Sequence, residues 1–126
     1  MKLKSVSGFT CYCADLEKTS KFYLDLGFLA STRDEKHASF RLNWFSIDFV
    51  AQAKEEKQEF KKDANAVSKG EGVYFNISVE NVDEIYEELI QKGYKPSSKP
   101  RDWPWGNREF VMRDPDGYKL VFFQKI

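Results

Sequence analysis

The spacing of apolar residues predicts two amphipathic helices, one in each half of the chain. The first runs over about 15–26 and the second over about 82–92, because apolar side chains recur there every three or four residues. Each segment begins with a residue that can accept a hydrogen bond from the first turn, and each is followed by a glycine that can end a helix. The predicted caps are Asp15 and Asn81, and the glycines are Gly27 and Gly93.

Alternating apolar and polar residues predict strands around both helices. Segments 9–13 and 73–79 precede the helices. Asp114-Pro115-Asp116-Gly117 predicts a hairpin, because proline suits the second position of a type I turn and glycine accepts the positive φ that follows. The further predicted strands are 30–33, 39–42 and 44–51 in the first half and 95–97, 109–113 and 118–124 in the second.

The two halves are a repeat with an offset of 66 residues. This shift places Phe9 on Phe75 and also superposes the two caps and the two glycines. Both halves therefore predict the order β-α-β-β-β. The sequence predicts an α+β fold in one domain, 1–126, in which two βαβββ modules form curled mixed sheets around one cleft.

The modules are predicted over 5–51 and 73–125. The segment between them, 52–72, carries five lysines and five acidic residues, which is typical of a solvated connector.

Composition and charge narrow the function. The chain has 20 Lys and Arg and 20 Asp and Glu, so it has no basic field for nucleic acid or an anionic membrane. No apolar run reaches the roughly 18 residues of a membrane span, and no signal peptide precedes the fold, so we expect a cytoplasmic protein. Cys11 and Cys13 are expected to be small buried strand residues. The 20 aromatic residues of 126 exceed what a small core needs and indicate a ligand pocket.

Two motifs resemble those of the vicinal oxygen chelate superfamily, which includes glyoxalase I, bleomycin-resistance proteins and extradiol dioxygenases. The segment 14–28 is similar to its first-helix signature, and Trp105-Gly106-Asn107-Arg108-Glu109-Phe110 followed by 114–118 is similar to its closing signature. The resemblance covers roughly residues 5–125 and implies the fold described above. Similarity to the bleomycin-resistance members also implies a homodimer.

Catalytic members of the superfamily hold a divalent metal at four positions, and the resemblance carries these onto Gly8, Asp48, Tyr74 and Val121. Glycine and valine have no donor atom, and a neutral tyrosine is a poor ligand for a hard ion. One carboxylate is too few for a metal site. His37 lies outside all four positions and is expected at the surface. We therefore expect no metal and no cofactor.

Strand alternation places further residues on the same faces as these four positions. The expected wall is aromatic with a few hydrogen-bonding groups, which suits a flat organic ligand. The alternative is that Trp44 and Tyr74 fill the concavity themselves. The candidate ligand-binding residues are Tyr12, Trp44, Asp48, Tyr74, Asn76, Trp103, Trp105 and Phe123.

Two of these candidates have open alternatives. The loop 101–106, with Trp103 and Trp105, is either a lid over a ligand or an anchor in a subunit interface. Asp48 is an anchor for a cationic ligand, a general base, or a partner in an ion pair. The cations that could pair with Asp48 are Arg108, Arg113 and Lys119.

Three functions are compatible with these observations. The favoured one is a metal-free protein that sequesters a flat aromatic or cationic small molecule, as the antibiotic-resistance members do. The second is a lyase, isomerase or dioxygenase with a degenerate metal site or an acid/base pair such as Asp48 and Tyr74. The third is a non-catalytic dimeric domain whose cleft is filled by its own side chains.

Overall fold

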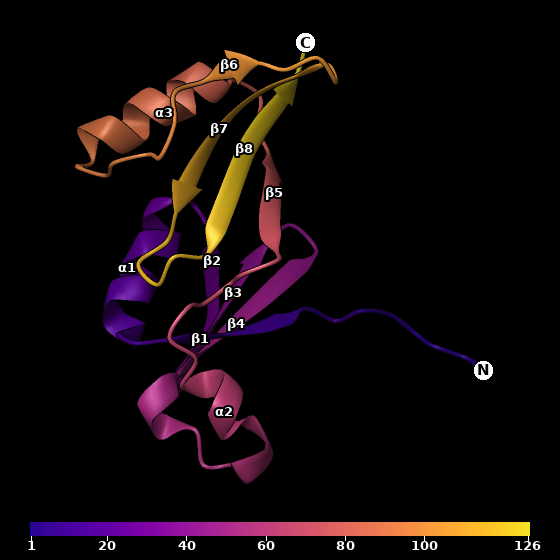
Figure 1. Cartoon of the computed structure of the whole chain (residues 1–126), viewed down its shortest axis with the longest axis vertical. Helices are drawn as coiled ribbons and strands as arrows, with labels where there is room; N and C mark the ends of the chain where they lie inside the picture. Colours follow the sequence, from indigo (N-terminus) through magenta and orange to yellow (C-terminus); the bar gives the residue numbers. More distant parts are fainter. The chain divides into compact units, whose positions relative to one another are not determined.

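The computed structural model describes all residues, 1–126, and the chain divides into two compact units. The first unit comprises Met1–Val67 and the second Ser68–Ile126. They correspond to the indigo-to-magenta and the orange-to-yellow parts of the chain in Figure 1. Each unit contains one four-stranded sheet and is described by itself below.

The first unit has the predicted element order. Its elements are β1 (Phe9–Cys13), α1 (Leu16–Asp25), β2 (Leu29–Arg33), β3 (His37–Leu42) and β4 (Phe45–Ala51). The strand order in the sheet is β1-β4-β3-β2, with β1 parallel to β4 and the other pairs antiparallel. Three short helical segments follow, η1 (Gln52–Lys54), η2 (Gln58–Phe60) and α2 (Lys61–Ala64), within the stretch predicted as a charged connector.

The second unit repeats this arrangement. Its elements are β5 (Tyr74–Ser78), α3 (Val82–Gln91), β6 (Arg101–Asp102), β7 (Asn107–Arg113) and β8 (Lys119–Lys125). The strand order is β5-β8-β7-β6, and β5 runs parallel to β8 as β1 does to β4. The predicted duplication of a β-α-β-β-β module is confirmed, and so is the α+β class.

Both long helices begin and end as predicted. The side chains of Asp15 and Asn81 each accept a backbone N–H of the first turn at 3.1 Å. Gly27 and Gly93 follow the helices with φ of +100° and +90°, a conformation that glycine adopts without a steric penalty. α1 and α3 have ten residues each, and no helix of the chain is long and apolar enough to cross a membrane.

Aromatic rings fill the space between each helix and its sheet. In the first unit, buried Tyr23 of α1 lies 4.7 Å from Phe49 of β4 between ring centroids. In the second unit, Tyr86 of α3 meets Phe110 edge-on at 5.4 Å, and Phe110 stacks on Phe122 at 4.9 Å. Such pairs add about 0.5–1.5 kcal/mol each beyond the area they bury. A large share of the aromatic surplus is therefore core.

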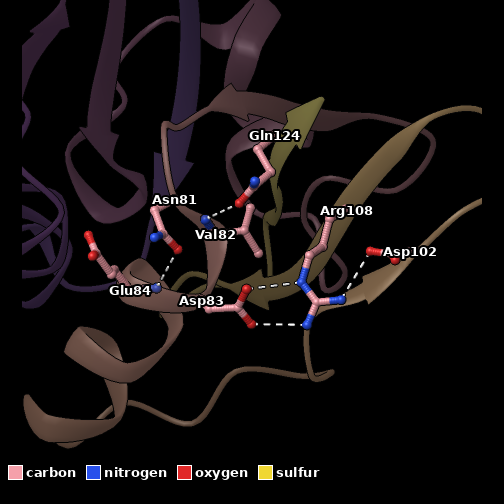
Figure 2. Close-up of polar contacts among 7 residues, drawn as sticks. All are labelled: Asn81, Val82, Asp83, Glu84, Asp102, Arg108 and Gln124. Atoms are coloured by element: carbon pink, nitrogen blue, oxygen red, sulfur yellow. Dashed lines mark hydrogen bonds and ion pairs between the residues drawn. The ribbon is translucent and has the colours of Figure 1, made fainter. Parts of the chain in front are cut away.

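The N-terminus of α3 is tied to the sheet by polar contacts (Figure 2). Arg108 of β7 donates two 3.0 Å hydrogen bonds to the carboxylate of Asp83 and a third to Asp102 of β6. These hydrogen bonds hold the pKa of Asp83 below its usual value. The N–H of Val82 donates to Gln124 Oε1 at 2.6 Å. One end of the helix is thus fastened to β7 and β8, and Arg108 also links β6 to this cluster.

The prediction of a strand over 95–97 is wrong. This stretch approaches β7 at a single residue: the Ser97 N–H donates to the carbonyl of Val111 at 2.8 Å, and Ser98 Oγ accepts the Val111 N–H at 2.9 Å. Pro100, which lacks an N–H donor, separates these contacts from the true edge strand, β6. The predicted hairpin at 114–117 is confirmed, with the Gly117 N–H donating to the Asp114 carbonyl at 3.0 Å.

We expect Asn81→Ala to lower the free energy of unfolding by about 1 kcal/mol, because the substitution removes the hydrogen bond that caps α3. Urea denaturation followed by circular dichroism measures the loss. Asn81→Ser keeps an acceptor and is the matched control. An alanine variant that unfolds at the midpoint of the unmodified protein would contradict the assignment.

Candidate functional site

The sheet registers show that the four positions carried over from the superfamily are equivalent in pairs. In β1 and β4, Thr10 lies opposite Asp48, and in β5 and β8, Asn76 lies opposite Val121. Asp48 and Val121 therefore occupy the same place in the two units. Gly8 and Tyr74 stand two residues before Thr10 and Asn76, and so they are equivalent as well.

The residues at these positions do not fit a divalent metal. A Cβ at Gly8 would lie 2.5 Å from the carbonyl oxygen of Ser46, so a ligating side chain there would force β1 and β4 apart. Val121 is buried and apolar, and the Lys119 ammonium lies 5.5 Å from the Tyr74 ring. Within residues 1–126 no three His, Cys, Asp or Glu side chains are placed to hold a metal ion. We derive no metal-dependent step.

Asp48 lies in a polar row that crosses the first sheet. Its carboxylate accepts a short hydrogen bond from Ser39 Oγ, and Thr10 stands on its other side in the register. Arg108, one of the three cations expected as possible ion-pair partners of Asp48, forms ion pairs with Asp83 and Asp102 instead. The row offers a half-buried carboxylate flanked by hydroxyl groups, which is suited to accept hydrogen bonds from a polar ligand.

Tyr12 lies on β1 and is engaged by the segment that follows β4. Its hydroxyl donates to Glu55 Oε2 at 2.7 Å. Burial, together with the hydrogen bond to Glu55 and its charge, raises the pKa of Tyr12 to about 12. The donated hydrogen bond also lowers the pKa of Glu55. The phenol ring of this candidate therefore has a fixed orientation.

Trp44 does not lie on a strand face as expected. β4 begins at Phe45, and Trp44 belongs to the two-residue turn after β3, where Asn43 has a φ of +57°. Its side chain is 81% exposed and meets the Phe45 ring edge-on at 6.2 Å. Phe9, the first residue of β1, is 51% exposed and also contacts Phe45, at 5.7 Å.

The two tryptophans between β6 and β7 form a stack. The rings of Trp103 and Trp105 lie 4.6 Å apart at an interplanar angle of 15°. The guanidinium carbon of Arg101 lies 3.4 Å from the Trp103 ring centroid. Arg101 therefore covers the face of Trp103 opposite to Trp105, because a guanidinium and an indole cannot both stack on the same face of one ring. The order is Arg101, Trp103, Trp105, and Trp105 at the end of the stack is 61% exposed.

Backbone hydrogen bonds hold the stack in place. The Trp103 N–H donates to the Asn107 carbonyl at 2.8 Å, and the Gly106 N–H donates to the Trp103 carbonyl at 3.1 Å. The N–H of Ile126 donates to the carbonyl of Gly106 at 3.0 Å. The indole nitrogen of Trp105 donates to Glu109 Oε2 at 3.1 Å. The loop is a tight, braced turn that presents a fixed aromatic surface.

The remaining candidates lie on β5 and β8. Tyr74 is 55% exposed, Asn76 lies opposite Val121, and Phe123 lies opposite both Ser78 and Glu109 in the registers. Phe123 and Glu109 therefore share a row with Arg101, which pairs with Glu109 in the β6–β7 register. The structure thus brings Phe123 into the same row of the second sheet as the base of the tryptophan loop.

Sequence reasoning missed the polar residues that support these candidates. Glu55 lies 43 residues from Tyr12, Ser39 lies nine residues from Asp48, and Glu109 lies four residues from Trp105. Arg101 lies on β6, whereas the sequence predicted a strand at 95–97. The only usable signal was the turn chemistry of Pro104 and Gly106, which indicates a hairpin and hence a neighbour for Arg101.

Comparison with known proteins identifies the family of this fold. The family model described as "Glyoxalase/Bleomycin resistance protein/Dioxygenase superfamily" matches residues 6–122. The chain belongs to this superfamily. The resemblance found in the two signature motifs is confirmed, and so is the fold that it implied.

The chain is similar in sequence to bleomycin resistance proteins and in structure to several solved proteins. Bleomycin resistance proteins of Geobacillus stearothermophilus and Staphylococcus aureus are each 28% identical to it over 120 residues, covering 89% of this chain and 90% of theirs. A glyoxalase/bleomycin resistance protein/dioxygenase from Nocardioides has a TM-score of 0.81 at 24% identity, covering 100% of this chain and 87% of that one. Lactoylglutathione lyase from Agrobacterium tumefaciens has a TM-score of 0.73 at 18% identity, covering 98% and 95%. The structural likenesses show the fold.

We expect one of the six tyrosines to ionise late, with a pKa of about 12, because the Tyr12 phenolate would be desolvated and would face Glu55. Protonated Tyr12 stabilises the fold below pH 10, and that contribution disappears as the pH rises toward 12. An absorbance titration of tyrosinate measures it. The late step should vanish in Tyr12→Phe and move to lower pH in Glu55→Gln; a late step that persists in Tyr12→Phe would contradict the assignment.

Proposed function

We propose that the protein is a cytoplasmic binding protein that sequesters a flat aromatic or cationic small molecule without a metal, and so confers resistance to it. The observation that carries this proposal is the indole stack of Trp103 and Trp105, which presents one open aromatic face from a braced turn. A surface ring held in this way loses little conformational entropy when a ligand stacks on it.

The donor set supports binding rather than metal-dependent chemistry. Gly8 and Val121 offer no ligand atoms where catalytic members place theirs, while each sheet keeps a polar side chain that could orient a molecule bound to it, Asp48 in the first unit and Asn76 in the second. The bleomycin resistance proteins are similar to this chain over 89% of its length. Their name makes bleomycin the first compound to test.

We expect the unmodified protein to bind metal-free bleomycin and Trp105→Ala to bind it at least about tenfold more weakly. The reason is that burying the exposed ring of Trp105 under a ligand contributes on the order of 1.5–3 kcal/mol to the binding free energy. Isothermal titration calorimetry measures both affinities. Phe60→Ala, which removes an exposed ring of η2, is the matched control and should bind as the unmodified protein does.

Two results would count against this proposal. If the unmodified protein shows no binding, sequestration of this compound is wrong. If binding requires an added divalent metal, the metal-free part is wrong, and the lyase, isomerase or dioxygenase alternative gains support.

We also propose that the protein is a homodimer. β1 is an outer strand of its sheet, and exposed rings gather at that end of the first unit, where Phe9 and Trp44 both contact Phe45. Exposed apolar rings beside the outer strand of a sheet favour association with another copy.

Light scattering should therefore give a molar mass of twice 14.7 kDa. The double substitution of Phe9 and Trp44 by serine should shift the mass toward that of one chain, because it removes the exposed rings that a second copy would cover. A monomer in the unmodified protein would contradict the dimer.

A further inference from the structure

Glu109 of β7 is a carboxylate that has two neutral donors and no cation. Its Oε2 accepts the indole N–H of Trp105 at 3.1 Å and the side-chain amide of Asn107 at 3.2 Å. Both bonds go to the same oxygen. The second oxygen, Oε1, is left as an acceptor beside the exposed indole.

The nearest cation in the sheet register does not neutralise this charge. Arg101 lies directly opposite Glu109 in the β6–β7 ladder, but its guanidinium stacks on Trp103 at 3.4 Å. The other arginine of this region, Arg108, forms ion pairs with Asp83 and Asp102. Glu109 is thus a half-buried carboxylate of this hairpin that forms no ion pair.

A half-buried carboxylate forms its most stabilising hydrogen bond with a donor that carries a positive charge. A hydrogen bond in which one partner is ionised is roughly twice as strong as a neutral one, and a cationic donor adds a Coulomb attraction to the carboxylate that grows where water is partly excluded. An indole face also attracts cations, because its π-electrons carry negative charge density. The open face of Trp105 and the spare oxygen of Glu109 therefore favour the same kind of ligand.

We propose that Glu109 determines ligand charge: the ligand is a planar aromatic cation that stacks on the outer face of Trp105 and donates an N–H to Glu109 Oε1. This inference rests on the proposed function and goes further by assigning the charge of the ligand to one residue. Arg101 does not oppose the cation strongly, because Trp103 and Trp105 lie between its guanidinium and the open face.

The test compares three probes with one ring system. 9-Aminoacridine is a planar cation at neutral pH, acridone is neutral, and acridine-9-carboxylate is an anion. Equilibrium dialysis measures the affinity of each for the unmodified protein and for Glu109→Gln, which keeps the shape of the side chain and an acceptor for Trp105. Glu87→Gln, on the exposed face of α3, removes one negative charge elsewhere and is the matched control.

We expect 9-aminoacridine to bind the unmodified protein and Glu87→Gln at least about tenfold more tightly than acridone. In Glu109→Gln this preference should fall to within about twofold, while the affinity for acridone stays unchanged. Added salt should weaken the binding of 9-aminoacridine and leave the binding of acridone unchanged.

The failures are distinguishable. If acridone and 9-aminoacridine bind the unmodified protein equally, or if Glu109→Gln keeps the preference, the role of Glu109 is wrong while stacking on Trp105 stands. Tighter binding of acridine-9-carboxylate would make Arg101 the residue that determines charge and would also overturn the inference. If none of the three probes binds although bleomycin does, the inference is wrong while the proposed function stands; if bleomycin does not bind either, both fall.

Discussion

The parallel pairing of the first strand of each unit with its last strand is the constraint on which the rest of the structure depends. Parallel neighbours require a crossover, and here the chain between them contributes a helix and two further strands. The helix covers one face of the sheet with aromatic rings such as Tyr23 and Tyr86. The opposite face is thereby left for polar and exposed aromatic residues, and every candidate on strands β1, β4, β5 and β8 belongs to it.

The chain has the superfamily fold, and glycine and valine stand at two of the four positions to which the resemblance carries the metal ligands. At Gly8 the backbone of β4 comes so close that no side chain fits, and at Val121 the position is buried and apolar. Neither residue has a side-chain atom that could bind a metal ion. What remains available for function is a set of shallow contacts, among which the indole stack is the most rigid because its turn is braced by the end of the chain at Ile126.

Charge in the second unit is divided between structure and recognition. Arg108 holds two carboxylates and so fastens α3 and β6 to the sheet. Arg101 forms a stack instead of an ion pair, and this choice leaves Glu109 with neutral donors alone. A chain with equal numbers of cationic and anionic residues can thus still present a local negative site, because each cation is oriented by its own packing.

The sequence by itself determined the features that depend on neighbouring residues: both helices with their caps at Asp15 and Asn81, the 114–117 hairpin, and the repeat from which the α+β fold follows. It placed Trp44 on a strand, but a shift of one residue at the start of β4 puts it in a turn. Only the tertiary structure decided that Tyr12 meets Glu55 and that Arg108 of β7 holds Asp83 of α3. These contacts join residues 43 and 25 positions apart, and they depend on how distant segments pack together, which no local pattern encodes.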